Sequence, residues 1–288
     1  MKFTKMHGLG NDYIYINAMT ETVNCPEELA VQMSKKHFGV GADGLILIRQ
    51  SDVADFKMDM YNADGSRAEM CGNGIRCVGK YVYDNKLTNK NDIFIETLSG
   101  IKRLFLEEEN EIVKSVTVEM GQPELRSAMI PVISDKEITR NEEVEIDGEK
   151  YTISCVSMGN PHTILFVEDV REVNIEEIGP KIETNQLFPK KTNVEFVEVV
   201  SKNIIRMRVW ERGTGVTLAC GTGACASVVA CVLNGYTNRR VEAVLDGGIL
   251  TIDWNESNNV VSMRGPAETV FEGIYMIPEV ASYLSEKA

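Results

Sequence analysis

The chain has 288 residues, of which 43% are hydrophobic and 25% charged, an ordinary balance for a globular protein long enough for two domains. Its formal net charge of −13, without a Lys/Arg-rich stretch, argues against a nucleic-acid partner. The N-terminus lacks the apolar run of a signal peptide, and no run approaches the roughly 20 apolar residues of a membrane span. Seven cysteines without the spacing of a disulfide framework predict reduced thiols in a cytoplasmic protein.

In chain order, short runs rich in β-branched and aromatic residues alternate with a few helical segments. Asn24 or Cys25 is expected to cap a helix that begins near Pro26 and ends at about His37. Residues 107–111 form a charged run that is typical of a hairpin tip. Strands are predicted at residues 3–6, 13–17, 45–49, 56–61, 93–97 and 269–277.

An internal repeat organises the chain. Three pairs of short motifs are each separated by 149 residues: Gly10-Asn11 and Gly159-Asn160, Tyr61-Asn62 and Trp210-Glu211, Cys71–Gly74 and Cys220–Gly223. One shared register predicts an α+β fold of two pseudo-symmetric domains that arose by internal duplication. We expect an N-terminal domain of residues 1–118, completed by a C-terminal strand within 265–288, and a second domain of residues 119–264. The active site is expected in the cleft between them.

Each repeated cysteine stands at the predicted start of a helix. Cys71 is followed by a glycine-rich turn and then by apolar residues at helical spacing, and Cys220 is followed by the same pattern. A helix N-terminus offers unpaired N–H groups and a positive dipole, which favour a thiolate and predict a cysteine pKa below about 8.5. The same N–H groups can hold a carboxylate. Two thiols on opposite faces of one α-carbon suit proton removal and return with inversion.

Other interpretations of these motifs are weaker. Zinc is disfavoured because the cysteines lack the short Cys-x-x-Cys spacing of structural sites. A nucleotide-binding loop is disfavoured because there is no Gly-x-Gly-x-x-Gly motif opening a βαβ unit and no phosphate-loop lysine. The remaining cysteines are expected to be structural: Cys25, Cys77, Cys155, Cys225 and Cys231.

The motif set closely resembles the diaminopimelate epimerases over residues 2–273. The motifs that carry the resemblance are 11–13 (Asn-Asp-Tyr), 61–66, 70–77, 159–162, 192–195, 210–215 and 219–223. The resemblance implies interconversion of LL- and meso-diaminopimelate without pyridoxal phosphate or a metal, in lysine and peptidoglycan-precursor biosynthesis. It also implies diaminopimelate as the small-molecule partner and a possible homodimer.

The resemblance further implies roles for individual residues. Cys71 and Cys220 would be the two acid/base groups, and His162 and Glu211 would tune them. Gly72, Asn73, Gly221 and Thr222 would donate to the carboxylate at the reacting carbon. The other substrate ligands would be Asn11, Asn62, Asn160, Asn193, Glu211 and Arg212. One departure is Gly44, where many family members carry glutamine, so that an amide contact to the substrate is expected to be missing or replaced by water.

Three rival functions remain open at this point. Another thiol-pair racemase, such as one acting on proline, would need a smaller and more apolar pocket without Arg212. A thiol–disulfide redox protein would use Cys71 and Cys220 as a regulatory pair, although such pairs are usually close in sequence. A binding domain without catalysis would have little reason to keep both thiols.

Overall fold

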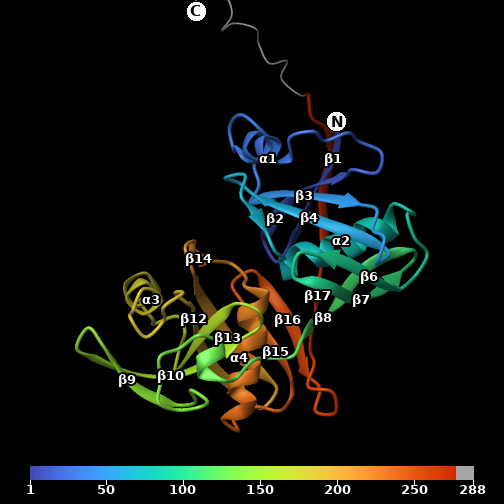
Figure 1. Ribbon diagram of the computed structural model, residues 1–288. Coiled ribbons are helices and arrows are strands. Elements are labelled where there is room, and N and C mark those ends of the chain that lie inside the picture. Colours follow the sequence, from blue (N-terminus) through green and yellow to red (C-terminus); the bar gives the residue numbers. More distant parts are fainter. Residues whose placement is uncertain (277–288) are drawn as a thin grey trace, which may run out of the picture.

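The computed structural model describes residues 1–276, and it shows a sheet-dominated α+β protein. Figure 1 shows two lobes, with the first half of the chain above and the second half below. The part of the predicted C-terminal segment after residue 276 lies outside the described residues. Within the described part, no helix is both long enough and apolar enough to cross a membrane.

The first half contains eight strands and two helices. The helix at residue 26 ends at Ser34, earlier than the predicted His37, because Lys35 turns to an extended conformation and Met33 O accepts from the N–H groups of Val40 and Gly41. The elements are β1 (Lys2–Gly8), β2 (Asn11–Asn17), α1 (Pro26–Ser34), β3 (Gly44–Arg49), β4 (Phe56–Asn62), β5 (Arg67–Ala68), α2 (Gly72–Asp84), β6 (Asp92–Thr97), β7 (Gly100–Glu109) and β8 (Ile112–Gly121).

The second half repeats this order with one added strand at its start and another at its end. The elements are a 3₁₀ turn (Ser127–Met129), β9 (Glu142–Ile146), β10 (Glu149–Ser157), β11 (Pro161–Val167), α3 (Ile175–Glu183), β12 (Asn193–Ser201), β13 (Ile204–Glu211), β14 (Gly215–Thr217), α4 (Gly221–Leu233), β15 (Arg240–Leu245), β16 (Gly248–Trp254), β17 (Val261–Pro266) and β18 (Glu268–Ile274).

The repeat expected from the motifs is present in the structure. Helices α1 and α3 have equal length and start 149 residues apart, and the same is true of α2 and α4. The strand pairing repeats as well: β2 runs parallel to β3 as β11 does to β12, and β4 runs parallel to β6 as β13 does to β15. The predicted α+β fold with two pseudo-symmetric halves is confirmed.

A long helix occupies the middle of each half. Helix α4 is apolar around its whole circumference, which is typical of a helix buried on every side, and it contacts strands β10–β13 and β15–β17. Helix α2 contacts β1, β2, β7 and β8. One hydrophobic cluster runs from residues of the first half into residues around α4, so the halves share a core.

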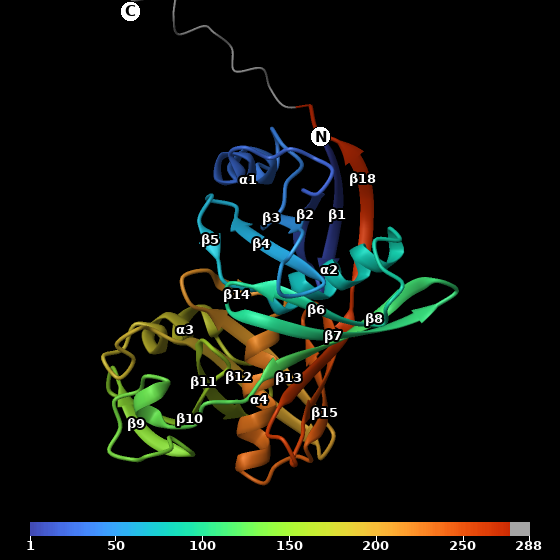
Figure 2. The same ribbon diagram turned by 45° about the vertical axis from the view of Figure 1, so that its right-hand side comes forward.

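Two strand pairings connect the ends of the chain to the rest of the sheet. Strand β17 pairs with β8, which joins the two halves, and the hairpin of β7 and β8 turns at residues 110–111, as the charged run predicted. Strand β18 pairs antiparallel with β1, beside which it lies in Figure 2. The last described strand therefore forms part of the N-terminal half.

Candidate active site

Cys71 and Cys220 are the N-cap residues of α2 and α4, as the sequence predicted. Each Sγ accepts a hydrogen bond from the backbone N–H three residues later, Gly74 or Gly223, at 3.4 Å in both cases. All seven cysteines are free thiols. The two helices therefore present equivalent thiols on equivalent turns.

The N-terminal ends of α2 and α4 meet at the junction of the two halves. Asn73 Nδ2, in the first turn of α2, donates to Ala219 O at 3.1 Å, directly before Cys220. Met263 lies against both helix starts: a Cβ added to Gly72 would lie 2.9 Å from its Cε, and one added to Gly221 3.0 Å from its Sδ. These glycines permit the close approach, so the two helix starts that the thiols cap lie close together.

Asn11 holds the thiol of Cys71. The Cys71 Sγ–H donates to Asn11 Oδ1 at 3.2 Å, and Asn11 Nδ2 donates to Asp43 Oδ2 at 2.8 Å. Because the carboxylate of Asp43 can only accept, it fixes which end of the Asn11 amide faces the sulfur. Asn11 and Cys71, which were both predicted from the sequence to be site residues, are therefore in contact.

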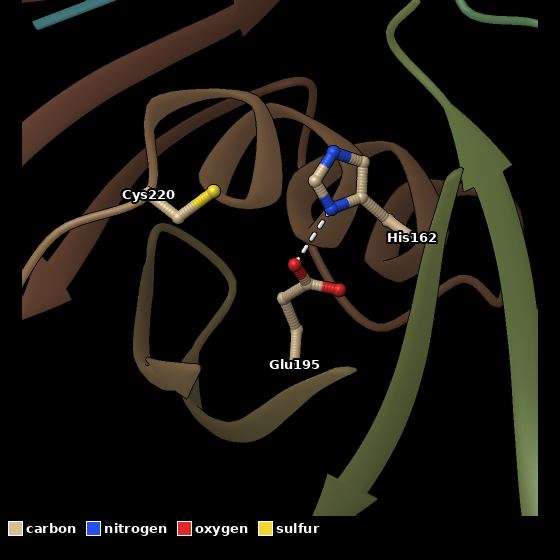
Figure 3. A group of neighbouring side chains, drawn as sticks. All are labelled: His162, Glu195 and Cys220. Atoms are coloured by element: carbon tan, nitrogen blue, oxygen red, sulfur yellow. Dashed lines mark hydrogen bonds and ion pairs between the residues drawn. The ribbon is translucent and has the colours of Figure 1, made fainter. Parts of the chain in front are cut away.

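A buried imidazole–carboxylate pair lies beside Cys220 (Figure 3). His162 Nδ1 and Glu195 Oε1 are 2.6 Å apart, and both side chains are fully buried. His162 Nε2 lies 3.0 Å from Asn160 Oδ1. Glu195 Oε2 has no hydrogen-bond partner within the described structure. This pair offers Cys220 a nearby site where a proton can be held.

The predicted fall in the cysteine pKa values is wrong for the protein without substrate. Burial raises the pKa of Cys71, although the backbone N–H groups of Gly74 and Asn73 oppose the rise. Burial raises the pKa of Cys220 well above its ordinary value, and the carboxylates of Glu211 and Glu195 raise it further. Desolvation of the thiolate outweighs the helix N-terminus at both positions. The charge of Glu211 raises the pKa of both thiols, which agrees with the tuning role expected of it.

His162, Glu195 and Cys220 are also the type of residues that bind metals, with ligand atoms within 4.8 Å of one another. Two ligands of a tetrahedral zinc ion lie about 3.3 Å apart, given metal–ligand distances of about 2 Å. The 2.6 Å separation of His162 Nδ1 and Glu195 Oε1 is shorter and fits a shared proton. The geometry favours proton storage.

The other predicted ligands make the following contacts within the protein. Asn193 Oδ1 accepts from the Arg212 backbone N–H at 2.9 Å, and the exposed Arg212 guanidinium donates to Lys190 O. Glu211 Oε1 accepts from Thr217 Oγ1 at 2.5 Å, and burial raises the pKa of Glu211. Thr222 Oγ1 lies 3.6 Å from Cys220 Sγ. Asn62, at the end of β4, donates to Ser66 Oγ within its own turn.

Gly44 has a structural reason to be glycine. It opens β3 opposite Asn62, and a Cβ at this position would lie 2.2 Å from Tyr61 O. A glutamine side chain would require the backbone to shift. The departure from the family pattern therefore accompanies a close approach of β3 to β4.

Glu195, Asp43 and Met263 were not singled out as site residues from the sequence. Glu195 had a usable signal, because it stands two residues after Asn193 on a strand, where alternate side chains share a face. Asp43 and Met263 had none, since their contacts with Asn11, Gly72 and Gly221 depend on the folded arrangement.

Two surface hollows, each lined by Tyr81, Asn85 and Glu272, lie toward the far end of α2 and involve neither thiol.

Comparison with known proteins identifies the family. A model of the family described as diaminopimelate epimerase matches residues 3–126 and 154–270. The chain belongs to the diaminopimelate epimerase family. A protein of Acetivibrio thermocellus named diaminopimelate epimerase is 59% identical over 95% of this chain and 98% of its own length. One from Methanococcus maripaludis with the same name is 57% identical over 95% and 99%.

Solved structures with much lower identity share the fold of this family. A phenazine biosynthesis protein of Bacillus anthracis superposes with a TM-score of 0.70 at 16% identity, covering 96% of this chain and 99% of its own. A probable proline racemase of Agrobacterium radiobacter superposes with a TM-score of 0.72 at 11% identity, covering 98% and 94%. At such identities the likeness concerns the fold alone.

Proposed function

We propose that this protein interconverts LL- and meso-diaminopimelate by proton transfer between Cys71, Cys220 and the α-carbon of the substrate. The observation that carries the proposal is the meeting of two equivalent thiol-capped helix starts, linked by Asn73 and Met263, in a member of the diaminopimelate epimerase family. The relatives named diaminopimelate epimerase support the choice of substrate over proline.

In this mechanism one cysteine begins as thiolate and the other as thiol. The thiolate removes the α-proton, and the thiol on the opposite face delivers its own proton to the carbanion, which inverts the centre. The thiol and thiolate then stand exchanged, so the reverse reaction uses the same pair. The N–H groups of the helix turns after Cys71 and Cys220 would bind the α-carboxylate and stabilise the charge that develops on it.

The remaining predicted ligands would hold the amino-acid end that does not react. Arg212 would bind its carboxylate, since a guanidinium offers two parallel donors. The amides of Asn62, Asn160 and Asn193 would bind polar groups along the substrate. His162 and Glu195 would receive or return the proton that Cys220 exchanges between turnovers.

The test is proton NMR of the reduced protein with LL-diaminopimelate in heavy water, without added cofactor. We expect deuterium at the α-position and appearance of the meso isomer. Cys71→Ala and Cys220→Ala should each lower the rate by about 1,000-fold, within the range that positioned acids and bases contribute. Cys225→Ala, which alters a buried thiol in the same helix as Cys220, serves as the matched control and should keep near-normal turnover.

Exchange with proline but not with diaminopimelate would show that the assigned substrate is wrong and would leave the two-thiol mechanism in place. Normal turnover in either active-site variant would refute the two-thiol mechanism. A homodimer stays a prediction of the family resemblance, and a cytoplasmic location stays a prediction of the cysteine pattern. We also propose that residues 1–118, with the strand β18, and residues 119–264 are the two domains; β8 and β17 extend across these bounds and join them.

A further inference from the structure

Arg76, in the second turn of α2, is the largest fully buried side chain of the described structure, with 0% exposure. Its guanidinium donates to Pro266 O at 3.0 Å and to Gly72 O at 3.3 Å, and it contacts Met263 Sδ at 3.8 Å. Nη2 has no partner, and none of the ion pairs found within residues 1–276 includes Arg76. Burial lowers the pKa of Arg76, yet a guanidinium stays protonated in proteins. Arg76 is therefore a buried cation without a counter-anion among the residues that the structure describes.

The fold makes room for this cation. A Cβ added to Gly8 of β1 would lie 2.8 Å from Arg76 Nη2, and one added to Gly265 of β17 would lie 3.2 Å from Nε. The two strands, which come from opposite ends of the chain, thus each have a glycine where the guanidinium lies. An apolar side chain would fill such a slot at lower cost, because an unpaired buried charge is strongly unfavourable. A nearby group that becomes an anion would offset that cost.

The groups whose charge interacts with Arg76 are, from the strongest to the weakest, Cys77, Cys71, Tyr15 and Cys225. Burial raises the pKa of Cys77 to about 11, that of Cys225 to about 12, and that of Tyr15 well above its ordinary value, so these three stay neutral near pH 7. Burial raises the pKa of Cys71 as well, but Cys71 is the partly exposed member of the set, and it caps the helix turn whose Gly72 O accepts from the guanidinium. It is the group that can supply the missing anion.

The repeat shows that this cation is confined to one half. Position 225, 149 residues after Arg76, is a neutral cysteine in α4. Conversely, His162 and Glu195 of the second half correspond to Tyr13 and Ile46 in the first. The backbone is duplicated, but the buried charges are not: a guanidinium donates to Gly72 O, the carbonyl of the residue after Cys71, and an imidazole–carboxylate pair lies beside Cys220.

We propose that Arg76 is a positioning residue that makes Cys71, and not Cys220, the resting thiolate of the pair. This inference rests on the two-thiol function proposed above. The groups that face Cys71 are Arg76 on α2, Asn11 and Tyr13 on β2, Asp43 before β3 and Glu211 on β13. Those that face Cys220 are His162, Glu195 and Glu211 on β11, β12 and β13. Only the first set contains a permanent cation.

The test measures the pH dependence of iodoacetamide alkylation at each thiol of the full-length reduced protein, read by peptide mass spectrometry. In the wild type the alkylation midpoint of Cys71 should lie below that of Cys220. Arg76→Met should raise the Cys71 midpoint by about one pH unit, which is tenfold less thiolate at a given pH, and leave that of Cys220 unchanged. Arg76→Lys, which keeps the charge, should have a Cys71 alkylation midpoint close to that of the wild type.

Lys80→Met is the matched control, because Lys80 is a second buried cation on α2 but is paired with Asp84 at 2.7 Å. It should lower stability without moving the Cys71 midpoint. An unchanged midpoint in folded Arg76→Met, or an equal shift in Lys80→Met, would overturn the proposal. If Arg76→Met does not fold, the wild type decides alone: a lower midpoint for Cys220 than for Cys71 refutes it.

A kinetic measurement separates this role from a purely structural one. The acid limb of kcat/KM in Arg76→Met should move to higher pH together with the alkylation midpoint, whereas loss of folded protein would lower the whole profile without moving it. Alkylation needs no turnover. Absence of exchange with diaminopimelate would therefore count against the proposed function and leave the alkylation result to judge Arg76.

Discussion

At the scale of single residues, the two thiols differ in what surrounds them. Cys71 is bonded to the amide of Asn11, while Cys220 lies beside the carboxylate of Glu195 and the ring of His162. The carboxylate fixes the orientation of the imidazole, as an acidic partner does for a catalytic histidine in general. Glu195 should therefore affect the rate of proton transfer more than the affinity for substrate.

Glu195→Gln should lower kcat by about 100-fold with little change in KM, because the amide keeps the volume and removes the charge. Steady-state kinetics of epimerisation measure both constants. Glu198→Gln on the same strand, whose carboxylate pairs with Arg206 at 2.7 Å, is the control and should stay within about twofold of the wild type. A pure KM effect in Glu195→Gln would show a role in binding instead.

The raised pKa values of the thiols set the pH dependence. Burial raises the pKa of Cys71 and of Cys220, so the fraction of thiolate is small at neutral pH and grows as the pH rises. We expect kcat/KM to increase from pH 6.5 through the ordinary thiol pKa of about 8.5. A profile that is flat between pH 6.5 and 8.5 would contradict raised thiol pKa values in the free enzyme.

At the scale of elements, the first turns of α2 and α4 are equivalent in backbone but differ in what packs against them. A Cβ at Gly223 would lie 2.6 Å from Glu195 Oε1 and 3.2 Å from Cys220 Sγ. A Cβ at the equivalent Gly74 would meet the methyl ends of Ile46 and Met58, at 2.8 and 3.4 Å. A flexible methyl group can move aside, whereas the buried Glu195 carboxylate, which is hydrogen-bonded to His162, cannot do so freely.

Gly223→Ala should therefore lower epimerisation at least tenfold, while Gly74→Ala should stay within about fivefold of the wild type. Both changes favour the helix by about 1 kcal/mol of intrinsic propensity, so a difference between them reports on the site. Kinetics together with thermal unfolding measure the pair. Equal losses in the two variants would show that the turn itself, and not the Glu195 contact, is sensitive.

At the scale of the whole molecule, strand β18 completes the N-terminal half. Phe3 of β1 is 8% exposed, and its ring lies edge-on to that of Phe271 at 5.8 Å between centroids. A Cβ at Gly273 would lie 2.8 Å from the Phe3 ring. Phe3 of β1 thus packs against Phe271 and Gly273 of β18, at the other end of the chain.

Phe3→Ala should lower the free energy of unfolding by about 3 kcal/mol, the usual cost of truncating a buried phenylalanine. Phe271→Ala should cost about 1 kcal/mol, since its side chain is 44% exposed and loses chiefly the aromatic contact. Urea unfolding measures both. Equal costs would argue that β18 is held by its backbone hydrogen bonds and not by this side-chain packing.

Sequence reasoning predicted the repeat, the two helix starts and the return of the last strand, because periodicity and the glycine-rich turns carry that information locally. It did not predict the direction of the thiol pKa shifts, since the desolvation of Cys71 and Cys220 depends on packing across the two halves. Nor did it predict the pairing of His162 with Glu195, which are 33 residues apart and meet through the parallel register of β11 and β12.

The pairing of β1 with β18 has a consequence for synthesis on the ribosome. The first half of the nascent chain emerges with the edge of β1 open, and the partner strand is translated more than 250 residues later. Until residue 274 leaves the exit tunnel, that edge stays available to other chains, as unpaired strand edges generally are. The N-terminal half is therefore first to be made and last to be completed, and chaperones that shield open edges would act on it during that interval.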